Sequence, residues 1–261
     1  MASQPTISSP ANAQCKDAAE KKALQDAQYC FPYHYLAHFR GTAACNGRFL
    51  DWGWQYLTYM SYISEYARKL CPESILDVGC GDGFFLNNLG LDQTRLLGVD
   101  QNENSIAFAR AFSSGAEFQA RDVADLSEQF DLATSIEVLE HIPDQDIPGF
   151  VSAMAARIKP GGHLIVCVPT DVVPVSAKHF RHYNETLLAE QMQGQPLKQV
   201  EQVRLWKRTA RLKLLLFLLH NKYWHLAHPW LRSFFWKRHQ KRTFFATARN
   251  GAQLVTVYEK L

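Results

Sequence analysis

From residue 74 onward, short runs of apolar residues alternate with longer segments in which apolar residues recur at helical spacing. The short runs predict strands at 74–78, 95–99, 116–119, 132–136 and 163–168. The segments between them predict helices at 84–89, 103–112 and 145–158. Because strands that alternate with helices form right-handed crossover units, this order predicts an α/β fold with a mostly parallel sheet covered by helices on both faces.

The two ends of the chain have different patterns. Residues 16–28 form a short polar helical pattern, and residues 54–70 carry large side chains at helical spacing until Pro72 ends the helix. Residues 184–193 predict another helix, and the alternation at 253–258 predicts a strand at the edge of the sheet. The predicted units are a disordered leader (1–14), a helical cap (15–72), the α/β core (73–200), a helical insertion (201–250) and a closing strand (251–261).

Apolar runs, the N-terminal residues and the cysteine pattern indicate the cellular compartment of the protein. The longest apolar run, residues 214–219, is far shorter than the roughly 20 residues that span a bilayer. The first residues lack the charged and apolar segments of a secretion signal. None of the six cysteines forms a Cys-x-x-Cys pair, which is typical of free thiols in a reducing compartment. We therefore expect a cytoplasmic protein.

The net charge is +3, but the charged residues are distributed unevenly along the chain. Between Gln202 and Tyr258 there are 12 Lys or Arg and no Asp or Glu, whereas the remainder holds 16 basic and 25 acidic residues. Residues 203–245 also contain four Trp. Three interpretations stay open, in this order of preference: a helical cap with solvated cations, peripheral contact with an anionic membrane surface, and a track for single-stranded nucleic acid.

A glycine-rich loop follows the strand at 74–78. The loop reads Gly79-Cys80-Gly81-Asp82-Gly83, and glycines at alternate positions let the backbone approach a ligand closely. A dinucleotide site would require a third glycine at position 84, where this chain has Phe84. The loop is therefore predicted to lie along an amino-acid-bearing nucleoside instead of a pyrophosphate.

Two acidic residues extend this site along the sheet. Asp100 closes the second strand about 20 residues past the glycine loop, where a carboxylate can accept both ribose hydroxyls. Asp122 follows the third strand, where neighbouring backbone can meet the adenine edge. Since ligands gather at the carboxyl ends of parallel strands, we expect the three elements to form one site.

Residues 74–169 resemble the class I S-adenosylmethionine-dependent methyltransferases. The motifs are LDVGCGDG (76–83), GVD (98–100), RDV (121–123), EVLEHI (137–142) and KPGGHLIVCVP (159–169). The resemblance implies a Rossmann-like fold with a seven-stranded, mostly parallel sheet, and S-adenosylmethionine as the cofactor. It implies that Asp77 orients the methionine amine through the loop, that Gly79 and Gly81 pack on the methionyl part, and that Asp100 holds the ribose. The cofactor site is also expected to include Cys80, Gly83, Gln101, Asp122, Val123 and Glu137.

Glu137, Glu140 and His141 follow the fourth strand at spacings that would place them on one face of a helix. They resemble the Glu-x-x-Glu-His ligand set of ubiquinone-pathway O-methyltransferases and small-RNA 2′-O-methyltransferases. One interpretation is a divalent metal that polarises substrate oxygens. The other is an element of the fold without metal, with Glu137 near the methionine end. We favour the second, which predicts that a chelator leaves activity unaltered.

A basic, histidine-containing segment at 178–184 follows the fifth strand. Methyl transfer from a sulfonium is an in-line displacement, so the protein has to position the acceptor and remove its proton. An imidazole suits the second task. His182 is our first choice for the base, His141 the second and His179 the third.

Three further segments, 31–36, 176–188 and 242–260, are similar to bacterial methyltransferases that modify glycans and lipid-linked saccharides. The leading hypothesis is therefore an O-methyltransferase acting on a sugar hydroxyl in glycan biosynthesis. The alternative is a small-molecule O-methyltransferase of quinone or secondary metabolism. An RNA methyltransferase and a non-catalytic cofactor-binding module are less favoured, and the oligomeric state is left open.

Overall fold

A computed structural model describes residues 17–26, 37–40, 43–46, 50–113, 115–219, 221, 224, 226 and 228–261. The predicted leader (1–14) and the segment at 31–36 lie outside the described residues.

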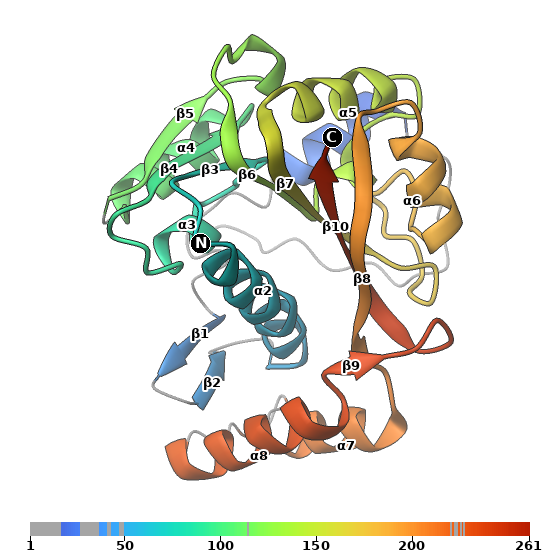
Figure 1. The fold of residues 1–261 in the computed structure, drawn as a ribbon. Coiled ribbons are helices and arrows are strands. Elements are labelled where there is room, and N and C mark those ends of the chain that lie inside the picture. The colour runs from blue at the N-terminus through green and yellow to red at the C-terminus, as the bar shows by residue number, and fades with distance from the viewer. Residues whose placement is uncertain are drawn as a thin grey trace, which may run out of the picture.

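The centre of the molecule is a mixed sheet with helices on both faces (Figure 1). Its strands are β3 (Ser74–Val78), β4 (Arg95–Asp100), β5 (Glu117–Ala120), β6 (Phe130–Ile136), β7 (Ile158–Pro169), β8 (Leu197–Lys207), β9 (Phe245–Ala246) and β10 (Gly251–Lys260). Their order is β5-β4-β3-β6-β7-β10-β8-β9, with β3 to β7 parallel and β10 antiparallel to both neighbours. This confirms the α/β, Rossmann-like prediction, although the described sheet has eight strands because the short β9 adds an edge.

The position of β10 corrects one prediction. The closing strand was expected at an edge of the sheet, but β10 lies between β7 and β8 and pairs with both. Residues 251–258 are buried without interruption, as befits a strand that is covered on both faces.

The helices are α1 (Ala18–Asp26), α2 (Leu50–Leu70), α3 (Phe84–Asn87), α4 (Glu103–Ala111), α5 (Ile147–Ala156), α6 (Glu185–Met192), α7 (Ala210–Leu219) and α8 (Pro229–Arg242). Two short 3₁₀ turns lie at Val123–Asp125 and Leu139–His141. Successive strand residues face opposite sides, so Ile75 packs in the core beneath α2 while Leu76 packs in the core beneath α5.

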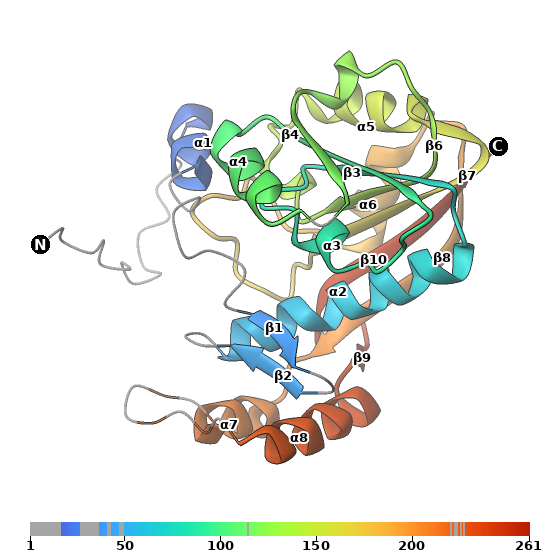
Figure 2. The same ribbon diagram turned by 90° about the vertical axis from the view of Figure 1, so that its left-hand side faces the viewer.

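Both ends of the chain differ in detail from their predicted units. The helical cap also contains the antiparallel strands β1 (Ala37–Arg40) and β2 (Ala43–Asn46), beside α2 in Figure 2. The insertion begins after Lys207, because residues 201–207 belong to β8. Within β8, Arg204 is buried in the sheet, where its guanidinium donates to both carboxylate oxygens of Glu185 at 2.7 Å.

Candidate active site

A cavity of about 720 Å³ opens at the carboxyl ends of β3, β4 and β6, on either side of the point where the strand order reverses. Of the predicted site residues, its lining includes Gly79, Asp100, Gln101, Asp122, Val123, Glu137 and His141. Its lining does not include the other predicted residues: Asp77, Cys80, Gly81, Gly83, Glu140, His179 and His182. The structure thus brings the glycine loop, the two acidic strand ends and the segment after β6 to one place.

The glycine loop is shaped by positive φ angles and close packing. Gly79, Gly81 and Gly83 have φ of 72°, 55° and 75°, which side-chain-bearing residues adopt at a cost. A Cβ on Gly79 would lie 2.5 Å from Cγ2 of Val138. Cys80 is buried, and burial raises the pKa of its thiol, so it remains a packing residue instead of a nucleophile.

Asp100 supports the loop as well as facing the cavity. One carboxylate oxygen accepts from the Gly81 amide at 3.0 Å, and the other accepts from the Asn102 amide at 2.8 Å. Asp77 is buried under the loop and accepts from the Thr134 hydroxyl at 2.6 Å. Burial, together with a smaller contribution from the nearby Asp100, raises the pKa of Asp77 to about 7. The described side-chain hydrogen bond of Asp77 is with β6, and its role toward the methionine amine stays a prediction.

Asp122 and Gln101 form a pair at the rim of the cavity. The Gln101 amide donates to Asp122 at 2.5 Å, and the other oxygen of Asp122 accepts from the Ala124 amide at 2.8 Å. The Asp122 carboxylate thus caps the 3₁₀ turn that carries Val123 into the cavity wall.

The segment after β6 does not form the predicted helix. The Glu137 amide donates to the Cys167 carbonyl at 2.9 Å, so the backbone stays paired with β7, and Glu137 takes a φ of 59°. Only a 3₁₀ turn at Leu139–His141 follows. The expectation of one helical face was therefore wrong. Glu137 lies beside Cys167 and Gln253, whose amide, oriented to donate, is 2.9 Å from its carboxylate.

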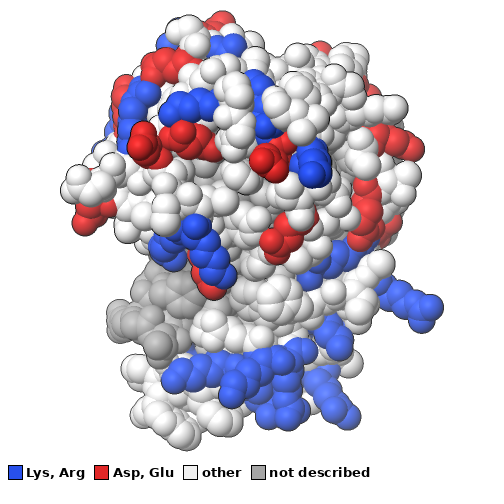
Figure 3. Space-filling model, viewed as in Figure 1, with Lys and Arg blue, Asp and Glu red and all other residues white. Residues whose placement is uncertain are grey.

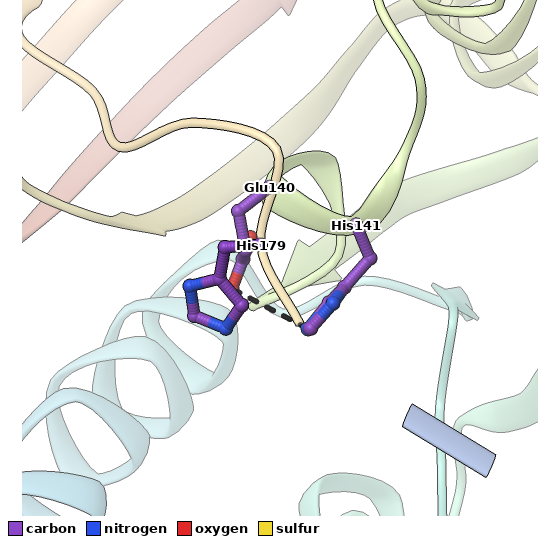
Figure 4. Close-up of side chains that lie close together, drawn as sticks. All are labelled: Glu140, His141 and His179. Atoms are coloured by element: carbon purple, nitrogen blue, oxygen red, sulfur yellow. Dashed lines mark ion pairs between the residues drawn. The ribbon is translucent and has the colours of Figure 1, made fainter. Parts of the chain in front are cut away.

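Glu140 and His141 instead gather with His179 (Figure 4). One ligand atom of each lies within 4.8 Å of the others. Glu140 is fully buried, and neither of its oxygens has a hydrogen-bond partner among the described residues. Burial and the nearby Glu137 raise the pKa of Glu140. A buried, unsatisfied carboxyl group is costly unless a ligand completes it.

Hydrogen bonds assign the protons of the histidines. Nδ1 of His141 faces the Lys178 carbonyl at 3.1 Å, and Nδ1 of His182 faces the Val173 carbonyl at 2.8 Å. A carbonyl only accepts, so both Nδ1 atoms carry protons. Nε2 of His182 then accepts from Nδ1 of His179 at 2.8 Å. The Nε2 atoms of His141 and His179 are left with lone pairs.

Burial also keeps these rings neutral. It lowers the pKa of His141 to about 3 and that of His179 to about 2. Neutral imidazoles with oriented lone pairs are good metal ligands and weak bases. Both ring nitrogens of His182 have partners, and it does not line the cavity. In this arrangement His182 orients His179.

Several cavity residues were missed by the sequence analysis. These are Lys21, Lys22, Gln25 and Asp26 of α1, whereas Lys178 and Phe180, which also line the cavity, belong to the predicted basic segment at 178–184. The Lys21 ammonium donates to the His179 carbonyl at 2.8 Å and lies 4.3 Å from the centroid of the Phe180 ring. These contacts join residues more than 150 positions apart, so no local pattern could have revealed them.

Comparison with known proteins identifies the family. A family profile described as a methyltransferase domain matches residues 52–248. The chain belongs to this methyltransferase family. The ubiquinone biosynthesis O-methyltransferase of Cronobacter sakazakii is 34% identical over 113 residues, which cover 40% of this chain and 46% of the relative. That of Photobacterium profundum is 31% identical, with 40% and 47% covered. The chain thus spans about half the length of these relatives.

Solved structures support the same fold. Magnesium protoporphyrin IX methyltransferase of Synechocystis, with bound S-adenosylmethionine, is 12% identical with a TM-score of 0.59 and covers 95% of this chain and 99% of its own. The N-methyltransferase NodS of Bradyrhizobium japonicum is 18% identical with a TM-score of 0.51, covering 77% and 96%. The family match and these folds support S-adenosylmethionine as the cofactor of this methyltransferase.

Proposed function

We propose that this protein is an O-methyltransferase that transfers the methyl group of S-adenosylmethionine to a hydroxyl of a small organic acceptor. The observation that carries the proposal is the group of Glu140, His141 and His179 beside the cofactor cavity, which His141 itself lines. A hydroxyl has to lose its proton when it is methylated, and the two described histidines of this group, His141 and His179, are weak bases because burial lowers their pKa values. The proposal therefore assigns hydroxyl activation to a cation.

The residues present fit a divalent cation. Glu140 would supply a carboxylate oxygen, and His141 and His179 would each supply Nε2. The bonds from His141 to Lys178 and from His179 to His182 would hold both rings in the ligating orientation. A cation held by three protein ligands keeps positions open for substrate oxygens and lowers the pKa of a bound hydroxyl. This ligand set has His179 in place of the Glu137 of the sequence-based set. The proposal also reverses the preference, stated from the sequence, for a segment that binds no metal.

The remaining parts of the site are proposed to hold the methyl donor. Asp100 would accept from the ribose hydroxyls while it supports the loop, and Gly79 would lie along the methionyl part. Val123 would pack near the adenine. Glu137, which lines the cavity, would face the methionine end, because burial raises its pKa to about 8 and an ammonium would compensate its charge.

The proposed acceptor has two neighbouring oxygens, since a cation with open positions binds such a pair together. Vicinal sugar hydroxyls and catechols both meet this requirement. The glycan resemblance of the outer segments supports the first class, whereas the similarity to ubiquinone biosynthesis O-methyltransferases supports the second. The chemistry at the cation is the same for both.

The test is methyl transfer from labelled S-adenosylmethionine to a panel of a catechol, a simple phenol and a saccharide with vicinal hydroxyls. The expected result is methylation of an oxygen, its loss in chelator and its return with a divalent cation. His179→Ala should lower the rate at least a hundredfold, whereas the exposed His228→Ala should not. Full activity in chelator, or methylation of nitrogen only, would overturn the proposal.

A further inference from the structure

The helical hairpin formed by α7 and α8 (residues 210–242) has one face packed on the body of the protein. Leu212, Leu216, Leu219 and Trp236 are buried there. Trp236 meets Trp54 of α2 edge to face, with ring centroids 5.2 Å apart. Nε2 of the buried His239 lies 2.9 Å from the Thr58 hydroxyl. These contacts fix the hairpin to the body, so its other face has a defined orientation.

The outer face of the hairpin is apolar at one end. Leu214 in the middle of α7 and Phe217 and Leu218 near its end are each more than half exposed, as is Trp230 at the start of α8, and Phe234 is 50% exposed. The Leu226 amide donates to the Leu219 carbonyl at 2.8 Å, and the Arg232 guanidinium donates to the Leu226 carbonyl at 2.9 Å. These bonds tie the end of α7 to the start of α8, so the exposed apolar side chains form one tip.

The opposite end of the hairpin is cationic. Exposed cations lie before and within the start of α7 and along the second half of α8: Arg208, Arg211, Lys213, Lys237, Arg238, Lys241 and Arg242. Figure 3 shows the Lys and Arg side chains gathered at the foot of the molecule, with no acidic side chain among them on this face. The sequence between Gln202 and Tyr258 contains no Asp or Glu to neutralise them.

We propose that the α7–α8 hairpin docks the protein on an anionic membrane surface. Aliphatic and aromatic side chains at the tip would enter the interface between headgroups and acyl chains, while the cations behind them would meet the headgroups. Within the described residues, no helix has the length and hydrophobicity of a membrane-spanning segment, so the contact is peripheral. A track for single-stranded nucleic acid would leave aromatic faces open for bases to stack on; here Trp230 and Phe234 stack on each other, and exposed leucines accompany them.

The test measures binding of the full chain to vesicles of phosphatidylcholine, with and without roughly one third phosphatidylserine, and to a single-stranded RNA oligonucleotide. Binding to the anionic vesicles alone is expected, and it should weaken as salt is raised. Lys237→Gln with Lys241→Gln should weaken it about tenfold or more, whereas the exposed pair Lys69→Gln with Lys198→Gln should not. Trp230→Ala should weaken it, whereas Phe112→Ala, exposed on the α/β core, should not.

The proposal would be overturned by no binding to anionic vesicles, by equal binding of the hairpin variants, or by tighter binding of RNA through the same residues. A dimer that depends on Trp230, measured by sedimentation without vesicles and accompanied by no vesicle binding, would also overturn it. All substituted side chains are exposed, and thermal melting of each variant checks that the fold is retained.

Discussion

The close approach of Gly79 to Val138 leads to a prediction with a matched control. Gly79→Ala places a methyl group 2.5 Å from Cγ2 of Val138, in a backbone with φ of +72°. The left-handed backbone costs about 1–2 kcal/mol for a residue with a side chain, and the crowded methyl adds about 1–3 kcal/mol. The expected loss of unfolding free energy is therefore about 2–5 kcal/mol.

Gly90→Ala separates the two contributions. Gly90 has nearly the same φ, +66°, but a Cβ there meets nothing within 4 Å. The unfolding free energy of Gly90→Ala should therefore fall only by the backbone contribution of about 1–2 kcal/mol. Urea unfolding of both variants measures the difference between their losses of unfolding free energy. Combining Val138→Ala with Gly79→Ala should remove most of this difference, because the double variant relieves the crowding. Equal destabilisation at Gly79 and Gly90, or a difference that Val138→Ala leaves unchanged, would refute the reasoning.

Three other predictions follow from the site and the core. Asp100→Ala should weaken S-adenosylmethionine binding tenfold or more, because it removes the proposed ribose acceptor and the support of the Gly81 amide; unchanged affinity by calorimetry would contradict this. Divalent cation binding should tighten as pH rises, because burial raises the pKa of Glu140, which has to release its proton to a metal; calorimetry should find no such binding in Glu140→Gln. Burial lowers the pKa of His239 to about 3, so its contribution to stability is complete above pH 6.5 and falls as the unfolded chain gains a proton below it. Between pH 7.5 and 5.5 this loss is about 1.4 kcal/mol, and it should be absent from the same comparison of urea unfolding curves for His239→Gln.

The core of the fold could be predicted because local patterns specify it. The bounds predicted for the strand at Ser74–Val78 are the observed ones, and those of β4, β5 and β6 agree within two residues, whereas β7 begins five residues before its predicted start. Gly79, Asp100 and Asp122 lie at or just after the carboxyl ends of parallel strands. These ends lie at one edge of the sheet, so the topology alone brings the three residues together.

The rest of the site depends on long-range contacts. The spacing of Glu137, Glu140 and His141 suggested a helical face, but pairing with Cys167 of β7 holds the backbone of Glu137 in the sheet. The ligand group is completed by His179, 38 positions beyond His141 in the sequence. The position of β10 inside the sheet and the contacts of α1 with the cavity are likewise set by tertiary packing.

The most direct measurement of the central claim is mass spectrometry of acceptor products after incubation with S-adenosylmethionine that carries a deuterated methyl group, with and without chelator. We expect the label on an oxygen of an acceptor with neighbouring hydroxyls, one S-adenosylhomocysteine formed per methyl transferred, and loss of both products in chelator. Label transfer that proceeds equally in chelator, or that reaches only nitrogen, would contradict the assignment of Glu140, His141 and His179 to hydroxyl activation.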